Sequence, residues 1–329
     1  MNTKFIFIGG VGRTGKSVTK EILSQSNDVI SFNFEYRFII DPDGIIDFLI
    51  SSQAWSPFIL DKKIKRLELF LLKLAKPSFF KNLVGSIIRS NKITKSRFNA
   101  NSYHNWNLER HLPNYRFHVK KLIDNLQEFS FRGNWVGADD FTYKSNIRYV
   151  SHKSQFEITD ILKKFLKELF DDLFDHHKKE ILVEDNTWNL LFLNEMSELF
   201  PGAKFIHLFR DPRDVVNSYC MQRWMPNDII QSGVICNDLY NQVLKNISRT
   251  KENKENEILE VSIEDLVNNK EKLIKKITNF CNIAPNEKMF DYALTNKSIG
   301  RWKNNFTKLD LQNLEPILRE TTEKLGYEW

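Results

Sequence analysis

Eight residues near the start of the chain have types and spacing suited to binding an anion. Positions 10–17 read GVGRTGKS and satisfy the pattern GxxxxGK[ST] between an apolar run and a helical pattern. Glycines allow a tight turn in which backbone N–H groups point into one hollow, and the dipole of the following helix adds positive potential there. Arg13 and Lys16 add full charges. The segment therefore predicts a phosphate-type loop.

A second anion motif lies in residues 205–219, which read FIHLFRDPRDVVNSY. An apolar strand pattern ends at Arg210, and Pro212 suits the first turn of a helix. Ser218 follows Arg210 by eight residues, about two helical turns into that helix. A guanidinium presents a fork of donors to a doubly charged anion, and a hydroxyl adds one more bond. The segment therefore predicts a second anion-binding motif.

The phosphate-type loop alone does not identify the anion. A kinase or NTPase also needs an acidic residue at the end of another strand to organise Mg²⁺, and residues 181–185 (ILVED) allow that interpretation. A P-loop kinase that uses Mg-ATP through Lys16, Ser17 and Asp185 is therefore one hypothesis. A non-catalytic nucleotide-binding module is another.

The motifs together resemble the sulfotransferase family that uses 3′-phosphoadenosine 5′-phosphosulfate (PAPS), in its bacterial or tyrosylprotein-type variant. Residues 261–266 (VSIEDL) resemble the family's strand-to-helix element, and residues 298–306 (SIGRWKNNF) resemble its C-terminal loop over the nucleotide. The resemblance implies that the first loop holds the 5′-phosphosulfate and that Arg210 and Ser218 hold the 3′-phosphate. It implies PAP as product, no metal, and these donor-binding residues: Gly12, Arg13, Thr14, Gly15, Lys16, Ser17, Val18, Arg210, Ser218, Gly300, Arg301, Trp302 and Lys303.

Three positions depart from the family's pattern. Lys16 stands where the family usually has Ser or Thr, and Ile263 replaces a Tyr that contacts adenine. Asp185 takes the place of a lysine that helps neutralise the transferring sulfuryl group. The resemblance therefore suggests that Lys16 supplies this charge instead, together with Arg13.

The resemblance also bears on the base that takes the acceptor's proton. Cytosolic members use a His, and Thr187 occupies the matching position here. Other members have a Glu-x-Arg motif at a similar distance after the loop, and Glu35 and Arg37 match that motif. Glu35 is thus the implied base, and Arg37 the implied support for the sulfuryl group or the acceptor. Asp185 is the alternative base. We expect Glu35 to follow a strand adjacent to the loop's strand, and Arg37 to point the same way if the chain stays extended.

The scaffold that positions these residues is predicted from alternating short apolar runs and helical patterns, which are typical of an α/β fold. The sequence predicts a P-loop-like parallel sheet of about five strands flanked by helices. Strands are expected at 5–8, 29–32, 181–183, 204–209 and 258–261. Helices are expected at 15–25, 188–199, 212–222 and 235–250, with another near the C-terminus.

Residues 41–178 read differently from the remainder, being mostly helical, basic at first and then aromatic. They separate the second expected strand from the third, so we predict a helical cap inserted between strands two and three. The whole chain, 1–329, is expected to be a single sulfotransferase-like domain. The acceptor expected is a hydroxyl of a small molecule or carbohydrate, and no nucleic acid is expected. The oligomeric state is left open.

Composition and charge limit the remaining choices. The chain has 329 residues, 41% hydrophobic and 27% charged, which excludes disorder or a fibrous protein. Three distant cysteines with no CxxC pair suggest neither a disulfide framework nor a zinc site. The absence of a long apolar run and of a leader pattern favours a cytoplasmic protein without a transmembrane segment. Residues 61–97 hold eight Lys and three Arg against Asp61 and Glu68, which predicts either peripheral contact with an anionic surface or a solvated helical face.

Overall fold

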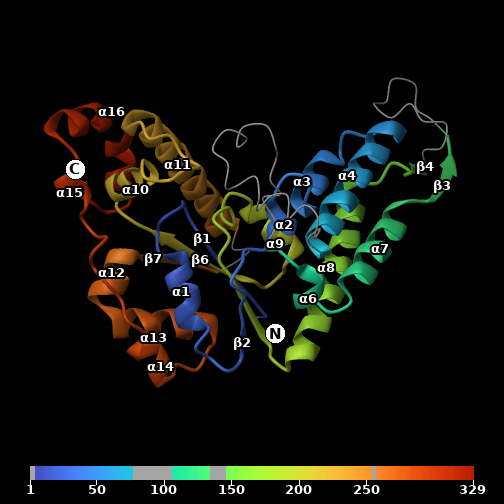
Figure 1. The fold of residues 1–329 in the computed structure, drawn as a ribbon, viewed down its shortest axis with the longest axis horizontal. Coiled ribbons are helices and arrows are strands. Elements are labelled where there is room, and N and C mark those ends of the chain that lie inside the picture. The colour runs from blue at the N-terminus through green and yellow to red at the C-terminus, as the bar shows by residue number, and fades with distance from the viewer. Residues whose placement is uncertain (1–3, 77–105, 134–145, 254–256) are drawn as a thin grey trace, which may run out of the picture. The chain divides into compact units, whose positions relative to one another are not determined.

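Two compact units make up the chain in a computed structural model, which describes residues 4–76, 106–133, 146–253 and 257–329 (Figure 1). The first unit combines Met1–Glu35 with Lys179–Trp329, and the second is Tyr36–Lys178. The expected insertion, 41–178, falls within the second unit, and its role as a cap stays a prediction.

The first unit contains a five-stranded sheet in which every pair of neighbours is parallel. This confirms the predicted α/β fold and its sheet. The strand order is β2-β5-β1-β6-β7. The strands are β1 (Phe5–Gly9), β2 (Val29–Ile30), β5 (Ile181–Glu184), β6 (Lys204–Phe209) and β7 (Ile258–Ser262).

The strand order corrects the expected surroundings of Glu35. Strand β5 lies between β2 and β1, so the strand before Glu35 is not adjacent to the strand that carries the phosphate-type loop. Strand β2 also ends at Ile30 rather than at residue 32. The neighbour of β1 on this side is β5, and Asp185 follows it directly.

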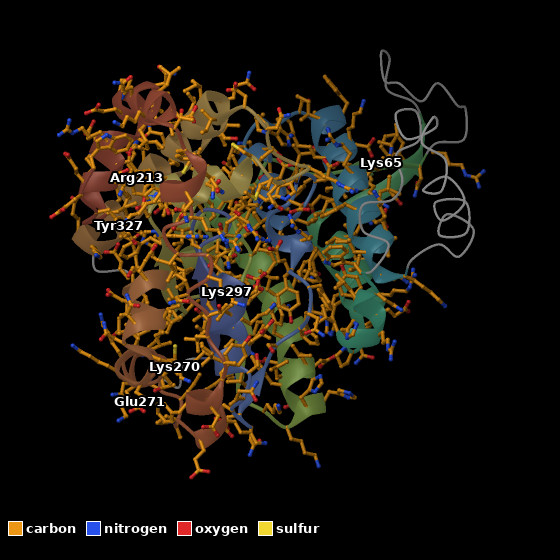
Figure 2. All side chains as sticks on the ribbon, turned by 60° about the vertical axis from the view of Figure 1, so that its left-hand side comes forward. Lys65, Arg213, Lys270, Glu271, Lys297 and Tyr327 are labelled. Atoms are coloured by element: carbon orange, nitrogen blue, oxygen red, sulfur yellow. The ribbon has the colours of Figure 1, made fainter. Side chains whose placement is uncertain are left out.

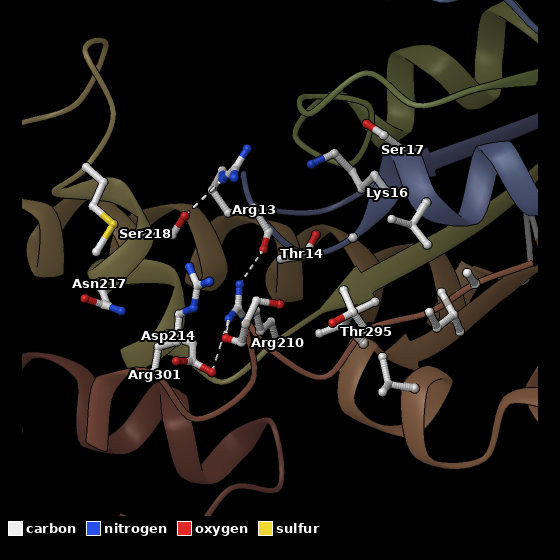
Figure 3. A pocket seen from close by; sticks show the side chains of 18 of the residues that line it. Arg13, Thr14, Lys16, Ser17, Arg210, Asp214, Asn217, Ser218, Thr295 and Arg301 are labelled. Carbon is white, nitrogen blue, oxygen red and sulfur yellow. Dashed lines mark hydrogen bonds and ion pairs between the residues drawn. The ribbon is translucent and has the colours of Figure 1, made fainter. Parts of the chain in front are cut away.

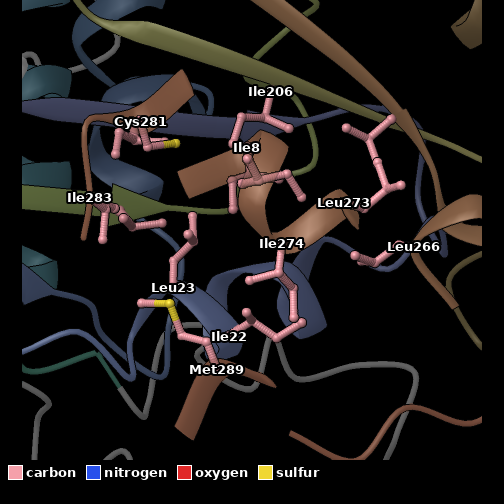
Figure 4. Packing of buried hydrophobic residues seen from close by; sticks show 14 of the residues in the cluster. Ile8, Ile22, Leu23, Ile206, Leu266, Leu273, Ile274, Cys281, Ile283 and Met289 are labelled. Atoms are coloured by element: carbon pink, nitrogen blue, oxygen red, sulfur yellow. The ribbon is translucent and has the colours of Figure 1, made fainter. Parts of the chain in front are cut away.

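Successive residues of β1 point to opposite faces of the sheet, as strand geometry requires. Ile6 and Ile8 belong to a core cluster with side chains from α1, α12, α13 and α14 (Figure 4). Phe5 and Phe7 pack instead against Phe200, which follows α9. The helices of this paragraph are α1 (Lys16–Leu23), α9 (Leu193–Leu199), α12 (Ile263–Asn268), α13 (Lys270–Cys281) and α14 (Glu287–Asp291).

A second cluster fixes the helices that follow β6. It contains Val215 and Tyr219 of α10, Tyr240 of α11 and Leu314 of α16, together with Val11 from the phosphate-type loop. This packing ties the loop to α10. The helices are α10 (Pro212–Tyr219), α11 (Ile229–Asn253), the short α15 (Trp302–Asn305) and α16 (Lys308–Lys324).

The Ile8→Ala variant tests how much this core supports the sheet. Ile8 is fully buried, with 0% of its surface exposed. Its truncation should lower the free energy of unfolding by about 2–5 kcal/mol, because buried contacts are lost and a cavity remains. The measurement is denaturant unfolding, with Leu309→Ala on the exposed side of α16 as a control that should shift stability by less than about 0.5 kcal/mol. Equal effects of the two variants would contradict the assigned core.

The second unit is mainly helical, and its described strands form an antiparallel pair. Its core includes an aromatic group of Tyr36, Phe38, Tyr115 and Phe170. The elements are α2 (Arg37–Ile40), α3 (Ile45–Ser51), α4 (Pro57–Ala75), α6 (Leu108–His111), α7 (Tyr115–Leu126), β3 (Phe129–Arg132), β4 (Asn146–Tyr149) and α8 (Gln155–His177).

The basic stretch 61–97 begins on α4, and residues 77–97 lie outside the described residues. Two cations of α4 have acidic partners: Lys65 pairs with Asp61 at 2.7 Å, and Arg66 pairs with Asp43 at 2.6 Å. These pairs reduce the positive potential of the helix, and contact with an anionic surface stays a prediction. Among the described residues, no helix combines the length and apolar character needed to span a membrane.

Candidate functional site

A pocket of about 480 Å³ lies in the first unit, where the phosphate-type loop meets the segment after β6 (Figure 3). Strands β1 and β6 pair directly, with Gly9 opposite His207. The segments that follow them therefore begin at the same edge of the sheet, where ligands of open α/β sheets bind. The two anion motifs of the sequence meet in this pocket, and the predicted residues that line it are Arg13, Thr14, Gly15, Lys16, Ser17, Val18, Arg210, Ser218 and Arg301.

Two glycines allow the loop its tight course. Gly10 has a φ of 140°, and a side chain there would collide with the carbonyl oxygen of Leu208. Gly15 has a φ of 88° as the N-cap of α1, and a Cβ atom would overlap Ile263. The loop can therefore bring the N-terminus of α1 to the pocket only with glycine at these positions.

Two buried tyrosines hold the two anion motifs in place. The Tyr219 hydroxyl accepts a hydrogen bond from the Gly12 N–H at 3.0 Å. The Tyr240 hydroxyl accepts from the Arg210 N–H at 3.2 Å and donates to the Arg210 carbonyl oxygen at 2.8 Å. Burial raises the pKa of both tyrosines, so both hydroxyls keep their protons at neutral pH. Gly12 is held behind the pocket and does not line it.

The Arg210 guanidinium connects three segments of the pocket (Figure 3). It donates to the Arg13 carbonyl oxygen at 3.2 Å and to the Ser298 carbonyl oxygen, and it pairs with Asp214 at 3.2 Å. The Arg13 side chain donates to the Ser218 hydroxyl at 3.0 Å. The Arg210 Nε is buried and has no hydrogen-bond partner in the part of the chain that the structure describes. Such a donor is suited to an incoming anion, because buried polar groups normally find partners.

Asp214 anchors the C-terminal loop of the motif. Its carboxylate accepts hydrogen bonds from the Gly300 N–H at 2.6 Å and the Trp302 N–H at 3.1 Å. The Arg301 side chain between them lines the pocket, whereas Gly300, Trp302 and Lys303 do not. Of the four donor-binding residues expected in this loop, one therefore faces the pocket.

Lys16 is the buried cation of the phosphate-type loop. Its ammonium donates to the Val11 carbonyl oxygen at 3.1 Å. Burial lowers the pKa of Lys16 to about 8, and the carboxylates of Glu35 and Asp185 partly oppose this shift, Glu35 more strongly. Glu35 thus acts on the ammonium group to which the resemblance gives a role in sulfuryl transfer, although Glu35 does not line the pocket.

Asp185, the alternative base, is occupied by another lysine. Its carboxylate forms an ion pair with Lys20 at 2.6 Å, and both side chains are almost completely buried. Lys20 also donates to the Phe32 carbonyl oxygen at 2.8 Å. Asp185 is therefore already paired, and neither Asp185 nor Glu35 lines the pocket, so the choice between them as the base stays a prediction.

Arg37 does not continue an extended segment after Glu35, as the sequence had suggested. It is the first residue of the short helix α2, and its guanidinium pairs with Asp41 four residues later at 3.3 Å. The helical turn changes the direction of the side chain, so alternation along a strand no longer relates it to Glu35. Its role in catalysis stays a prediction.

Several pocket residues were not predicted. Asp214, Asn217 and Met221 follow Arg210 by four, seven and eleven residues, a helical spacing that could have identified them together with Ser218. The pocket wall at residues 292–295 follows no motif and had no comparable signal. No group of three His, Cys, Asp or Glu side chains suited to a metal ion occurs among the described residues.

The fold and the pocket agree with a family match. Residues 6–287 match the model of the Sulfotransferase family. Since this match covers most of the chain, the protein belongs to the sulfotransferase family. The resemblance inferred from the motifs is therefore confirmed at the level of the family.

Several solved structures are similar to the chain, and the first of them supports the fold. The sulfotransferase domain from the curacin biosynthetic pathway has 11% identity and a TM-score of 0.50, and the match covers 100% of this chain and 99% of that one. The sulfotransferase domain of the Synechococcus PCC 7002 olefin synthase has 14% identity and a TM-score of 0.49, covering 100% and 96%. The Mycobacterium avium sulfotransferase STF9 has 12% identity and a TM-score of 0.45, covering 100% and 78%. No curated protein matches the chain significantly.

Proposed function

We propose that the protein transfers a sulfuryl group from PAPS to a hydroxyl of a small-molecule or carbohydrate acceptor. The observation that carries this proposal is the meeting of the two anion motifs in one pocket, with Arg13, Lys16, Arg210 and Arg301 along its walls. PAPS has anionic groups at two positions, and one charged cluster suits each of them.

The residues present fit such a donor. The loop from Arg13 to Val18 would hold the 5′-phosphosulfate, and Arg210, Ser218 and Arg301 would hold the 3′-phosphate. The remaining wall contains Ile263, Val267 and Leu294, which offer an apolar surface to the adenine. Ile263 therefore lines the pocket although it lacks the ring of the tyrosine usual in the family. When bound, the donor supplies the sulfuryl group.

The protein's own groups supply charge and a base. Lys16 and Arg13 would stabilise the negative charge that develops on the phosphate oxygen as its bond to sulfur breaks. Glu35 would accept the proton from the acceptor hydroxyl as the new oxygen–sulfur bond forms. The products are then the sulfate ester and PAP.

A Mg-ATP kinase is less well supported. That reaction would use Asp185 as a metal-organising carboxylate, but the buried ion pair with Lys20 already occupies it. A module that binds nucleotide without catalysis has the same donor pocket, so the transfer of label from PAPS to an acceptor distinguishes it from the enzyme.

The choice of nucleotide tests the proposal. PAP should stabilise the protein and bind much more tightly than 5′-AMP, because only PAP has the 3′-phosphate for Arg210 and Ser218. Arg210→Ala should weaken PAP binding by roughly 1.5–3 kcal/mol, the value of a charge-assisted hydrogen bond, which is about 10- to 150-fold in Kd. Calorimetric titration measures the Kd of PAP and of 5′-AMP for the parent and the variant.

Ser218→Ala is the milder companion variant, because it removes one hydroxyl and leaves the buried Asp214 paired with Arg210. It should weaken PAP binding more than 5′-AMP binding, because 5′-AMP has no 3′-phosphate but still meets Arg13, whose side chain donates to the same hydroxyl at 3.0 Å. Equal affinity of parent and variants for PAP would refute the assigned 3′-phosphate site. Stronger binding of Mg-ATP than of PAP would favour the kinase.

A further inference from the structure

The last residues of the chain contact α10 and α12, and Figure 2 labels Tyr327 and Arg213 in this region. The Tyr327 hydroxyl donates to a Glu264 carboxylate oxygen at 2.6 Å. The other oxygen of Glu264 accepts from the Asp211 N–H at 3.2 Å, next to Arg210. The Tyr327 ring also packs edge-on against Phe209, with ring centroids 6.3 Å apart. The end of β6 is thereby tied to the C-terminal residues.

Arg213 links the same residues to α10. It is buried, and its guanidinium pairs with Asp211 through two bonds of 2.9 and 2.8 Å. It also donates to the Glu328 carbonyl oxygen at 2.8 Å. Its guanidinium carbon, Cζ, lies 4.0 Å from the centre of the Trp302 ring and 5.3 Å from that of the Trp329 ring. Both distances fall within the range of cation–π attraction.

Trp302 connects this group to the pocket. Its indole N–H donates to Asp211 at 3.1 Å, and its backbone N–H donates to Asp214 at 3.1 Å. The preceding residue, Arg301, lines the pocket. A continuous series of contacts therefore runs from Trp329 through Arg213 and Trp302 to Arg301.

We propose that residues 327–329, the C-terminal tail, position the loop 298–302 through Arg213 and thereby set its affinity for the donor's phosphate. Tyr327 and Trp329 are positioning residues in this proposal, since neither lines the pocket. The effect on the loop depends only on the contacts above. The effect on donor affinity rests on the proposed function.

The test compares Trp329→Ala with the parent chain by amide hydrogen exchange and by PAP titration. Removal of the indole should speed exchange of the amides of residues 300–302 in the absence of nucleotide, because Arg213 loses one of its two aromatic partners. The Kd for PAP should rise about two- to fivefold, the scale of an exposed cation–π contact, and the Kd for 5′-AMP should change less. Trp329→Phe should restore the loop exchange rates and the Kd for PAP of the parent chain, because it keeps an aromatic face for Arg213.

Arg319→Ala is the matched control. Arg319 lies on α16 with 55% of its side chain exposed and pairs only with Glu315 and Glu323 among the described residues. Its loss should alter neither loop exchange nor PAP affinity. A further check compares the double variant Arg213→Gln/Trp329→Ala with Arg213→Gln alone. The two should show the same amide exchange in the loop, because the residue that connects Trp329 to the loop is absent from both.

Each outcome separates the alternatives. Unchanged exchange at 300–302 in Trp329→Ala would overturn the positioning role. A uniform rise in exchange over the whole first unit would also overturn it, since it would indicate a general loss of stability. A third outcome is that exchange in Trp329→Ala rises only in the loop while the parent chain does not prefer PAP to 5′-AMP. This result would support the positioning role and reject the proposed function.

Discussion

Glu35→Gln should reduce kcat by about 10²- to 10⁴-fold, the usual contribution of a positioned general base, while PAP binding is retained. The amide has nearly the shape of the carboxylate but cannot take a proton from the acceptor hydroxyl. Glu35 is half-buried and is the carboxylate that acts most strongly on Lys16. The measurement is turnover with labelled PAPS at saturating acceptor, together with calorimetric titration of PAP.

Asp185→Asn is the control that separates the two carboxylates. Asp185 holds Lys20 in a buried ion pair, so its replacement leaves a buried ammonium without its counter-charge. This variant should mainly lose stability, by about 3–5 kcal/mol for a fully buried pair. Folded Asp185→Asn protein should keep turnover far above that of Glu35→Gln. Normal turnover of Glu35→Gln beside an inactive but folded Asp185→Asn would assign the base to Asp185 instead.

Local sequence patterns were sufficient to predict the five strands of the parallel sheet, although β2 is shorter than expected, but not β3 and β4. The segment after β6 is the clearest case: the predicted strand 204–209 and the helix start at Pro212 agree with β6 and α10. Such features depend on residues close together in the chain, where propensities and capping act directly. The resemblance implied that the loop, Arg210 and Ser218 hold one nucleotide, and all of them line one pocket.

Long-range pairing could not be predicted in the same way. The insertion of β5 between β2 and β1 leaves no local mark in the sequence. The ion pair of Lys20 with Asp185 joins residues 165 positions apart, and the tyrosine contacts of Gly12 and Arg210 have the same long-range origin. The helix expected at 188–199 begins only at Leu193, where tertiary contacts outweigh the helical pattern. These features determine the partner of Asp185 and the contacts that hold the loops.

Lys16→Met should lower kcat by about 10²- to 10³-fold, the cost of removing one preorganised group that stabilises developing negative charge. Methionine fills much of the space of the lysine stem but has no charge. Lys16→Arg should retain a large part of the activity, because it keeps the positive charge near the transferring group. If Lys16→Met and the parent turn over equally, Arg13 alone supplies the charge, and the assignment of Lys16 is wrong.

The pH dependence of the parent enzyme provides a second test of Lys16, because its pKa is lowered to about 8 by burial. In the free enzyme kcat/KM should fall as pH rises through about 8, whereas kcat should hold to higher pH, since bound donor anions favour the charged lysine.

The contribution of Lys16 to stability should change in the opposite direction. Between pH 8 and 10.5 the unfolded chain keeps the proton that folded Lys16 has lost, so the contribution of Lys16 to the free energy of unfolding rises with pH. Denaturant unfolding of parent and variant at each pH separates the loss of activity from alkaline unfolding. Both trends should be absent from Lys16→Met, and an unchanged alkaline limb of kcat/KM in that variant would assign the titration to another group.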